Sequence, residues 1–366
     1  MDPRLKKLAN LLVHYSVKLK KGQLVRITGE VTTLPLLEEI YKEAIDVGAH
    51  PYITMRVPDV DEYRLKHGTD AQLKYINPMQ RMEVGKIDAF IHAWGNENKR
   101  YLAGVDGKRQ AIEQRAVRPF FHKMQKRIAA GDLKWVGTQF PTPADAQDAD
   151  MSMTEYEDFV YGAGHITSPD PVKHWKKVEK EQMRLVKILN RFDRLHVESA
   201  DTDLKLRVKG RKWISCHGTE NFPDGEIFTG PIEDSAEGTI RFSFPASYMG
   251  RSVEDVRLEF KKGKVVAESA GKNLKFLQDM LNIDRGARFV GEFAIGTNYG
   301  IKQFTRNTLF DEKIGGTCHM AVGDSIRESG GKNTSAIHWD MVCDLKKDSR
   351  ITADGKVIYR NGKFVI

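Results

Sequence analysis

The sequence predicts a two-domain α/β protein with a parallel sheet in the N-terminal half and a sheet-rich C-terminal half. Three observations predict this fold class. A chain of 366 residues exceeds the length that one hydrophobic core usually supports. Strand-like and helical patterns alternate up to about residue 194, whereas apolar residues recur at every second position beyond it. We therefore expect an N-terminal three-layer α/β domain over residues 1–195 and a C-terminal α+β domain over residues 196–366.

The N-terminal half alternates strand and helix signals. The apolar run Leu24–Ile27 predicts a strand, and the helix predicted after it has Pro35 in its first turn and Gly48 at its end. Further strand-like runs lie at residues 51–55, 87–92 and 133–137. Because helical patterns separate these runs, a parallel sheet is favoured. The basic stretch at 173–194 has apolar residues near helical spacing and predicts an amphipathic helix with a solvated charged face.

The C-terminal half shows the period-two pattern of half-buried strands. This pattern is clear at Leu204, Leu206, Val208, Ile240, Phe242 and Phe244. Three pairs ending in glycine separate alternating segments and predict tight hairpins, because glycine accepts a positive φ. These pairs are Lys262-Gly263, Asp354-Gly355 and Asn361-Gly362. One helix, at residues 271–281, is expected to interrupt the strands.

Composition excludes several classes of protein. A hydrophobic content of 40% rules out a disordered chain, and no apolar run is long enough to span a membrane. The N-terminal segment has no small-residue cleavage site, so we expect a cytoplasmic protein without membrane partners. The net charge of +8 is spread along the chain, so nucleic acid is not an expected partner. Three cysteines are too few for a disulfide framework and predict reduced, structural thiols: Cys216, Cys318 and Cys343.

Sequence signatures for four catalytic classes are absent, namely HExxH, GxSxG, Walker A and the Rossmann fingerprint. The segment that draws attention is Ile337–Met341. In an extended strand, His338 and Asp340 point to the same face, where they can bind one metal ion or two adjacent ions. The alternative is a surface pair of histidine and aspartate without a metal.

Four other residues are candidates of different strength. His319 lies among small and apolar residues and should be buried, either as a hydrogen-bonded core residue or as a ligand. Glu292 lies inside an apolar strand, where its charge requires a cation, which could be a metal ion, an arginine or a lysine. Glu226 follows the turn at residues 223–225. Glu312 has an acidic and a basic neighbour and, taken alone, indicates solvated surface.

Five blocks of sequence together resemble the thermophilic aminopeptidase family, the aminopeptidase T and aminopeptidase S type of metallopeptidase. The blocks occur in the family's order and span most of the second half, while the first half resembles the family more loosely. They are Asn221–Glu226, Gly291–Asn298, Asp311-Glu312, Gly316–Gly323 and Asn333–Asp340.

This resemblance implies a dimetal exopeptidase that releases N-terminal amino acids from peptides through a metal-bridged water, with its metal-binding catalytic domain at residues 196–366. It implies two divalent ions (Zn, Co, Mn or Mg), peptide substrates with a free N-terminus and a homodimer. Glu292 would bridge the ions, and Glu312 would be a ligand or the general base. The metal-ligand positions of the family fall on Glu226, Glu292, His319, His338 and Asp340, with Glu312 as the additional glutamate.

The sequence departs from the family pattern in two places. Seven positions separate Glu312 from His319, which is a longer loop than in the form of the family that it otherwise resembles. Ile326 stands where the family carries a tyrosine, so a phenol at the site is not expected. Two other functions stay open at this point: a dimetal hydrolase of another amide or ester, and a non-catalytic protein that binds metal or nucleic acid.

Overall fold

The computed structural model describes residues 2–366, and they form two compact units. Of the described residues, the first unit comprises 2–161, 166–172 and 218–222, and the second comprises 162–165, 173–217 and 223–366. The chain therefore passes between the units more than once, and the division into domains at residue 195 stays a prediction. In the described part of the chain, no helix combines the length and the apolar character needed to cross a membrane.

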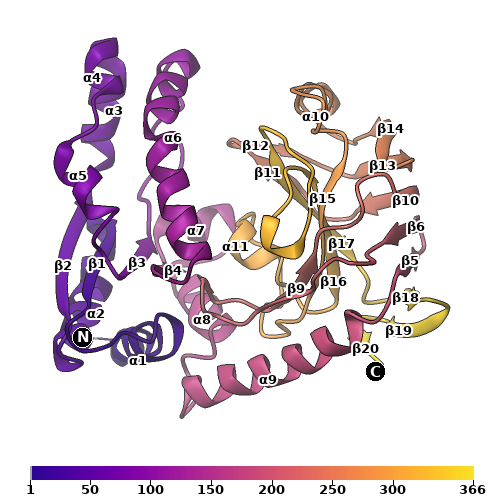
Figure 1. Ribbon diagram of the computed structural model, residues 1–366, viewed down its shortest axis with the longest axis horizontal. Coiled ribbons are helices and arrows are strands. Elements are labelled where there is room, and N and C mark those ends of the chain that lie inside the picture. The colour runs from indigo at the N-terminus through magenta and orange to yellow at the C-terminus, as the bar shows by residue number, and fades with distance from the viewer. Residues whose placement is uncertain (1) are drawn as a thin grey trace. The chain divides into compact units, whose positions relative to one another are not determined.

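The first unit is built on a five-stranded sheet in which every pairing is parallel (Figure 1). The strand order is β2-β1-β3-β4-β8. The strands are β1 (Leu24–Glu30), β2 (His50–Arg56), β3 (Ala89–Trp94), β4 (Lys134–Gln139) and β8 (Asn221–Phe222). This sheet confirms the predicted parallel α/β layer. The short strand β8 was not predicted, because it comes from far along the sequence and pairs with β4.

The helices of the first unit largely follow their sequence signals. The helix α2 (Leu34–Asp46) has a proline in its first turn, as predicted, and Gly48 adopts a positive φ just after it. The other helices are α1 (Pro3–Leu11), α3 (Pro58–His67), α4 (Asp70–Lys74), α5 (Pro78–Glu83), α6 (Gly107–Ala129), α7 (Pro143–Asp148) and α8 (Met153–Ala163), of which α8 ends in the second unit.

The second unit contains two larger sheets, in both of which the strands pair antiparallel. The eight-stranded sheet has the order β14-β13-β10-β6-β5-β18-β19-β20. Its strands are β5 (Arg194–Ser199), β6 (Thr202–Arg207), β10 (Glu237–Phe242), β13 (Val256–Lys261), β14 (Lys264–Ser269), β18 (Arg350–Ala353), β19 (Lys356–Arg360) and β20 (Lys363–Phe364). All three predicted hairpin turns are present in this sheet, and both residues of each turn have a positive φ.

The five-stranded sheet of the second unit has the order β17-β16-β15-β9-β7. Its strands are β7 (Ile214–Cys216), β9 (Glu226–Thr229), β15 (Val290–Gly296), β16 (Thr317–Gly323) and β17 (His338–Asp344). A two-stranded ribbon pairs β11 (Ala246–Tyr248) with β12 (Arg251–Val253). The helices are α9 (Pro171–Leu189), α10 (Leu274–Leu281) and α11 (Thr308–Asp311). Thus α9 ends five residues before the predicted limit, because Arg194 already begins β5.

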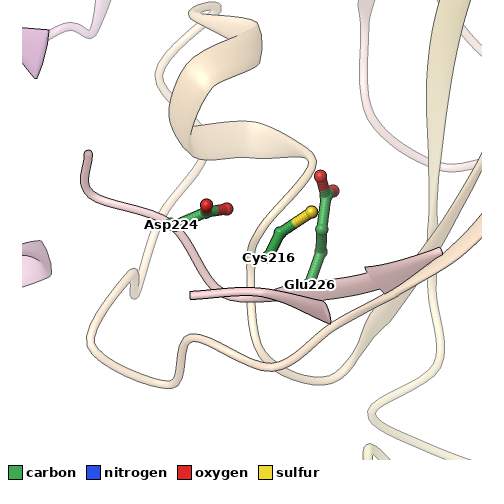
Figure 2. Close-up of side chains that lie close together, drawn as sticks. All are labelled: Cys216, Asp224 and Glu226. Atoms are coloured by element: carbon green, nitrogen blue, oxygen red, sulfur yellow. The ribbon is translucent and has the colours of Figure 1, made fainter. Parts of the chain in front are cut away.

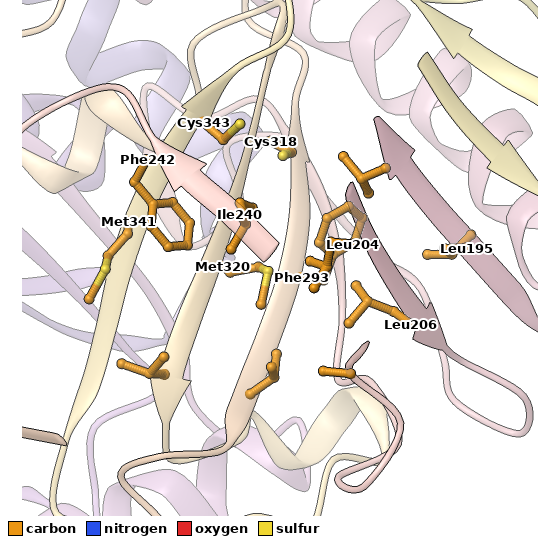
Figure 3. Packing of buried hydrophobic residues seen from close by; sticks show 14 of the residues in the cluster. Leu195, Leu204, Leu206, Ile240, Phe242, Phe293, Cys318, Met320, Met341 and Cys343 are labelled. Atoms are coloured by element: carbon orange, nitrogen blue, oxygen red, sulfur yellow. The ribbon is translucent and has the colours of Figure 1, made fainter. Parts of the chain in front are cut away.

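A single hydrophobic core joins the two larger sheets of the second unit (Figure 3). The eight-stranded sheet contributes Leu204, Leu206 and Ile240, and the five-stranded sheet contributes Phe293 and Met320. These side chains are fully buried, and each such residue stabilises the fold by about 1.5–3 kcal/mol. Because one face of the five-stranded sheet packs into this core, the polar side chains of its strands must project from the opposite face.

Candidate metal centre

The face of the five-stranded sheet that points away from the core carries the predicted metal ligands. In β15, Phe293 and Ile295 belong to the core, so Glu292 projects from the other face. The same alternation puts His319 of β16 opposite its core neighbours Cys318 and Met320. Four neighbouring strands thus bring five candidate ligands to one face: Glu226, Glu292, His319, His338 and Asp340.

Small residues on this face leave room for the ligands to converge. Ala321 is paired with Glu292 on one side and with Asp340 on the other, and Ala294 is paired with His319. Because alanine has only a methyl group, the longer side chains beside it can approach one another above the sheet. The predicted strand around His338 and Asp340 is confirmed as β17.

The carboxylate of Glu292 lies between the two histidines. Its Oε1 is 3.5 Å from Nε2 of His319, and its Oε2 is 3.5 Å from Nε2 of His338. The side chain is about 5% exposed, as expected for a charge inside an apolar strand. Its close partners are therefore imidazoles rather than the arginine or lysine that the sequence left open. A carboxylate whose two oxygens face two nitrogen donors has the geometry of a bridging ligand.

The remaining candidate ligands extend the cluster on both sides of Glu292. Nε2 of His319 is 3.3 Å from Oε2 of Glu226, and Nε2 of His338 is 3.4 Å from Oδ2 of Asp340. Two sets of three residues have ligand atoms within 4.8 Å of one another, which is close enough for each set to hold a metal ion. These sets are Glu226, Glu312 and His319, and Glu292, His319 and Asp340.

His338 is oriented as a metal-ligating histidine. Its Nδ1 donates a hydrogen bond of 2.7 Å to the backbone carbonyl of Asp324. This bond fixes the ring orientation and directs Nε2 toward Glu292 and Asp340, where it can bind a metal ion once it has lost its proton. The side chain of Asp340 is largely buried, so the two residues do not form the isolated surface pair that the sequence left open.

Several buried atoms of the cluster have no hydrogen-bond partner among residues 2–366. They are Oε2 of Glu226, both ring nitrogens of His319 and Oδ1 of Asp340, although Oε2 of Glu226 and Nε2 of His319 are 3.3 Å apart. An unsatisfied buried polar atom costs about 1–3 kcal/mol, so such atoms rarely gather without a compensating group. Carboxylate oxygens and imidazole nitrogens are also the donors that Zn²⁺ and related divalent ions prefer. The residues therefore fit a divalent metal centre.

Glu312 corrects the interpretation that its sequence neighbours suggested. Its side chain is about 14% exposed rather than solvated, and its Oε1 accepts a hydrogen bond from Nζ of Lys313. The ammonium group of Lys313 is fully buried and lies 3.4 Å from Oε1 of Glu226. Lys313 was not predicted as a member of the site. The only indication in the sequence was that several buried carboxylates need a cation nearby to compensate their charge.

The charged groups of the cluster shift one another's pKa values. Burial opposes the ionisation of Asp340, but the imidazole of His338 outweighs it and lowers the pKa of Asp340 to about 2. Burial also opposes the charge on both histidines, yet the surrounding carboxylates raise the pKa of His338 to about 11 and that of His319 to about 9. Burial raises the pKa of Glu292 above its ordinary value. Protons therefore compete with a metal ion for the same ligand atoms.

A third donor set adjoins the cluster through Glu226 (Figure 2). It comprises Cys216 of β7, Asp224 and Glu226. The turn before Glu226 requires glycine at position 225, because φ is +127° and a Cβ atom there would lie 2.6 Å from Cβ of Asn298. This turn buries Asp224 and delivers Glu226 to the first position of β9. Neither Cys216 nor Asp224 was predicted as a site residue.

Comparison with known proteins agrees with this chemistry. The model of the thermophilic metalloprotease family (M29) matches residues 1–364. The chain belongs to this family. The match confirms the resemblance found in the sequence and makes the protein a hydrolase that depends on a divalent metal ion. As a metalloprotease it requires ligands of the kind that the five-stranded sheet gathers.

Curated relatives and a solved structure extend over nearly the whole metalloprotease. Aminopeptidase 2 of Geobacillus stearothermophilus is 28% identical and covers 99% of this chain and 98% of its own. Aminopeptidase AmpS of Bacillus subtilis is 27% identical and covers 97% of both chains. The solved structure of wild-type AmpT from Thermus thermophilus has a TM-score of 0.86 at 23% identity and covers 100% of this chain and 99% of that chain. This last likeness confirms the predicted fold.

Proposed function

We propose that this metalloprotease is an aminopeptidase that uses two divalent ions to release N-terminal amino acids from peptides. The observation that carries the two-ion proposal is the position of Glu292, whose two oxygens each face a different histidine at 3.5 Å. The aminopeptidase names of the relatives support the choice of substrate, peptides with a free N-terminus. The rival proposal is a dimetal hydrolase of another amide or ester, which would use the same ligands.

Each residue of the cluster has a proposed role. Glu226 and His319 would hold one ion, His338 and Asp340 the other, and Glu292 would bridge them. The ions, which we propose to be Zn, Co, Mn or Mg, would supply Lewis-acid polarisation of the scissile carbonyl and activation of water. Glu312 would take a proton from the attacking water and return it to the leaving amine as general base and acid.

The oxyanion of the tetrahedral intermediate requires a donor that is not the phenol of the family pattern. Ile326 occupies that position, directly before the turn η3 (Arg327–Ser329), and cannot donate a hydrogen bond. We expect a backbone N–H group to stabilise the oxyanion instead, or the turnover to be lower than with a phenol. Two further proposals rest on the sequence and the family resemblance: a homodimer, which light scattering of the purified protein tests, and a cytoplasmic location, which fits three cysteines without disulfide spacing.

Removing the metal should abolish aminopeptidase activity. After treatment with EDTA and removal of the chelator, cleavage of aminoacyl-anilides should fall to background, and added Co²⁺, Zn²⁺ or Mn²⁺ should restore it. The matched control substrate is the same anilide with an acetylated α-amine, which should resist cleavage. Activity that survives thorough metal removal would contradict the metal proposal. Equal cleavage of the acetylated substrate would favour the rival amide or ester hydrolase.

The affinity for metal should rise with pH. Below about pH 9 both His319 and His338 bear protons when carboxylates are their only partners, because those carboxylates raise their pKa values. A protonated imidazole cannot bind a metal ion, so each ion must displace protons, and raising the pH makes this displacement easier. We expect the affinity to increase by at least about tenfold per pH unit between about pH 6 and about pH 8. Calorimetric titration in buffers of different ionisation enthalpy measures the proton release; an affinity independent of pH would contradict this expectation.

A further inference from the structure

The ammonium group of Lys313 is a cation of the cluster that, unlike a protonated imidazole, does not have to lose its charge when a metal ion binds. This side chain has 0% exposure, and its Nζ contacts both Glu226, at 3.4 Å, and Glu312. A buried ammonium is expensive unless it is paired, so these two contacts are what allow Lys313 to be charged there. The mechanism proposed above does not use Lys313.

The backbone holds Lys313 in this position. Its N–H donates to the carbonyl of Phe310 at the end of α11, and its carbonyl accepts from the N–H of Asn298. The following residue, Ile314, is also fully buried. These bonds fix the backbone from which the buried side chain reaches the cluster.

Glu226 stands between the ammonium group and the metal donors. Its Oε1 faces Lys313 at 3.4 Å, whereas its Oε2 faces Nε2 of His319 at 3.3 Å. An ion bound by Glu226, Glu312 and His319 would thus share two carboxylates with the ammonium group. On the other side of the cluster, Lys313 forms no ion pair with Asp340, and its charge acts on Asp340 less than the charges of the two histidines do.

Charge balance makes this arrangement consistent with two divalent ions. The cluster has four carboxylates with proposed catalytic or ligand roles, and buried Asp224 beside them is a fifth. Two divalent ions and one ammonium group carry five positive charges, which matches the number of these carboxylates. The charge of Lys313 also repels a divalent ion that shares its carboxylates.

We propose that Lys313 is a permanent cation of the metal centre and weakens the binding of a metal ion at Glu226 and His319, here called the Glu226 side. The ion at His338 and Asp340, on the His338–Asp340 side, therefore binds first. This inference rests on the proposed two-ion site. Lys313 is here a positioning residue: it acts through Glu226 and Glu312 and does not touch the substrate. The charge of Lys313 is part of the protein and does not dissociate as a bound ion does. Lys313 therefore holds Glu226 and Glu312 in place while the ion beside Glu226 exchanges.

Replacing Lys313 by methionine tests the proposal directly. Methionine has a similar length and no charge, so Glu226 and Glu312 become fully available to a metal ion. In calorimetric titrations of EDTA-stripped protein with Co²⁺, we expect wild type to show two unequal binding events, and Lys313→Met to tighten the weaker event by on the order of tenfold or more. The tighter event should change much less. The matched control is Lys302→Met, an exposed lysine eleven positions earlier in the sequence, which should leave both events unchanged.

A merely structural role for Lys313 predicts the opposite sign, because a disordered Glu226 would bind metal more weakly. An unchanged or weaker second event in a folded Lys313→Met protein would therefore overturn the proposal. If that variant does not fold, two other variants show which ion binds more tightly in wild type. Glu226→Gln should abolish the weaker binding event, and Asp340→Asn should abolish the tighter one. The reverse result would overturn the proposal. Wild type that binds no divalent ion at all would instead contradict the proposed function.

Discussion

Replacing Glu292 by glutamine should remove nearly all aminopeptidase activity and reduce the number of bound metal ions. Glutamine keeps the shape of the side chain but offers one neutral oxygen, so it cannot bridge two ions as an anion. Metal polarisation contributes several kcal/mol of transition-state stabilisation, so we expect turnover to fall by on the order of a hundredfold or more. Metal analysis by mass spectrometry and assays at saturating Co²⁺ measure both effects.

The Glu292→Gln protein should still fold. Burial raises the pKa of Glu292 above its ordinary value, so the charge of this carboxylate opposes folding unless a cation compensates it. A neutral glutamine removes that opposition, and the thermal midpoint of the EDTA-stripped variant should be equal to or higher than that of stripped wild type. Glu259→Gln, on the exposed side of β13, is the matched control and should keep full activity. A Glu292→Gln protein that retains two ions and normal turnover would show that Glu292 is not the bridge.

Local patterns predicted the features of the fold that depend on neighbouring residues. Asp354-Gly355 and Asn361-Gly362 form hairpin turns because their positive φ values suit asparagine, aspartate and glycine, and this preference is visible in two letters of sequence. The pairing of β8 with β4 had no such signal. It joins Asn221 to Gly137, which is far earlier in the sequence, and only the completed sheet determines it.

The same distinction explains which site residues could be predicted. Period-two alternation is enough to put His338 and Asp340 on one face, and an apolar strand is enough to make the carboxylate of Glu292 conspicuous. Glu312 and Lys313 lie outside the strands, after the single turn of α11, where no periodicity reveals the direction of a side chain. Their burial depends on how that turn meets β9, so the sequence neighbours alone wrongly indicated solvent.

Replacing Glu312 by glutamine should separate proton transfer from metal binding. The glutamine oxygen can still accept the hydrogen bond from Lys313, so the loop should keep its position. It cannot accept a proton from water, however, and loss of a general base typically lowers turnover by about 10² to 10⁴-fold. We therefore expect a large fall in kcat, with little change in KM and with both ions retained.

The Glu312→Gln result also distinguishes the two roles that the family resemblance allows for this residue. If Glu312 acts mainly as a ligand, the variant should lose an ion, and excess Co²⁺ should restore much of its turnover. If it acts as the base, excess metal should not help, because the missing function is proton transfer rather than occupancy. Glu328→Gln, an exposed glutamate in η3, controls for loss of a nearby charge and should behave as wild type. Turnover within about tenfold of wild type, with both ions bound, would exclude Glu312 as the base.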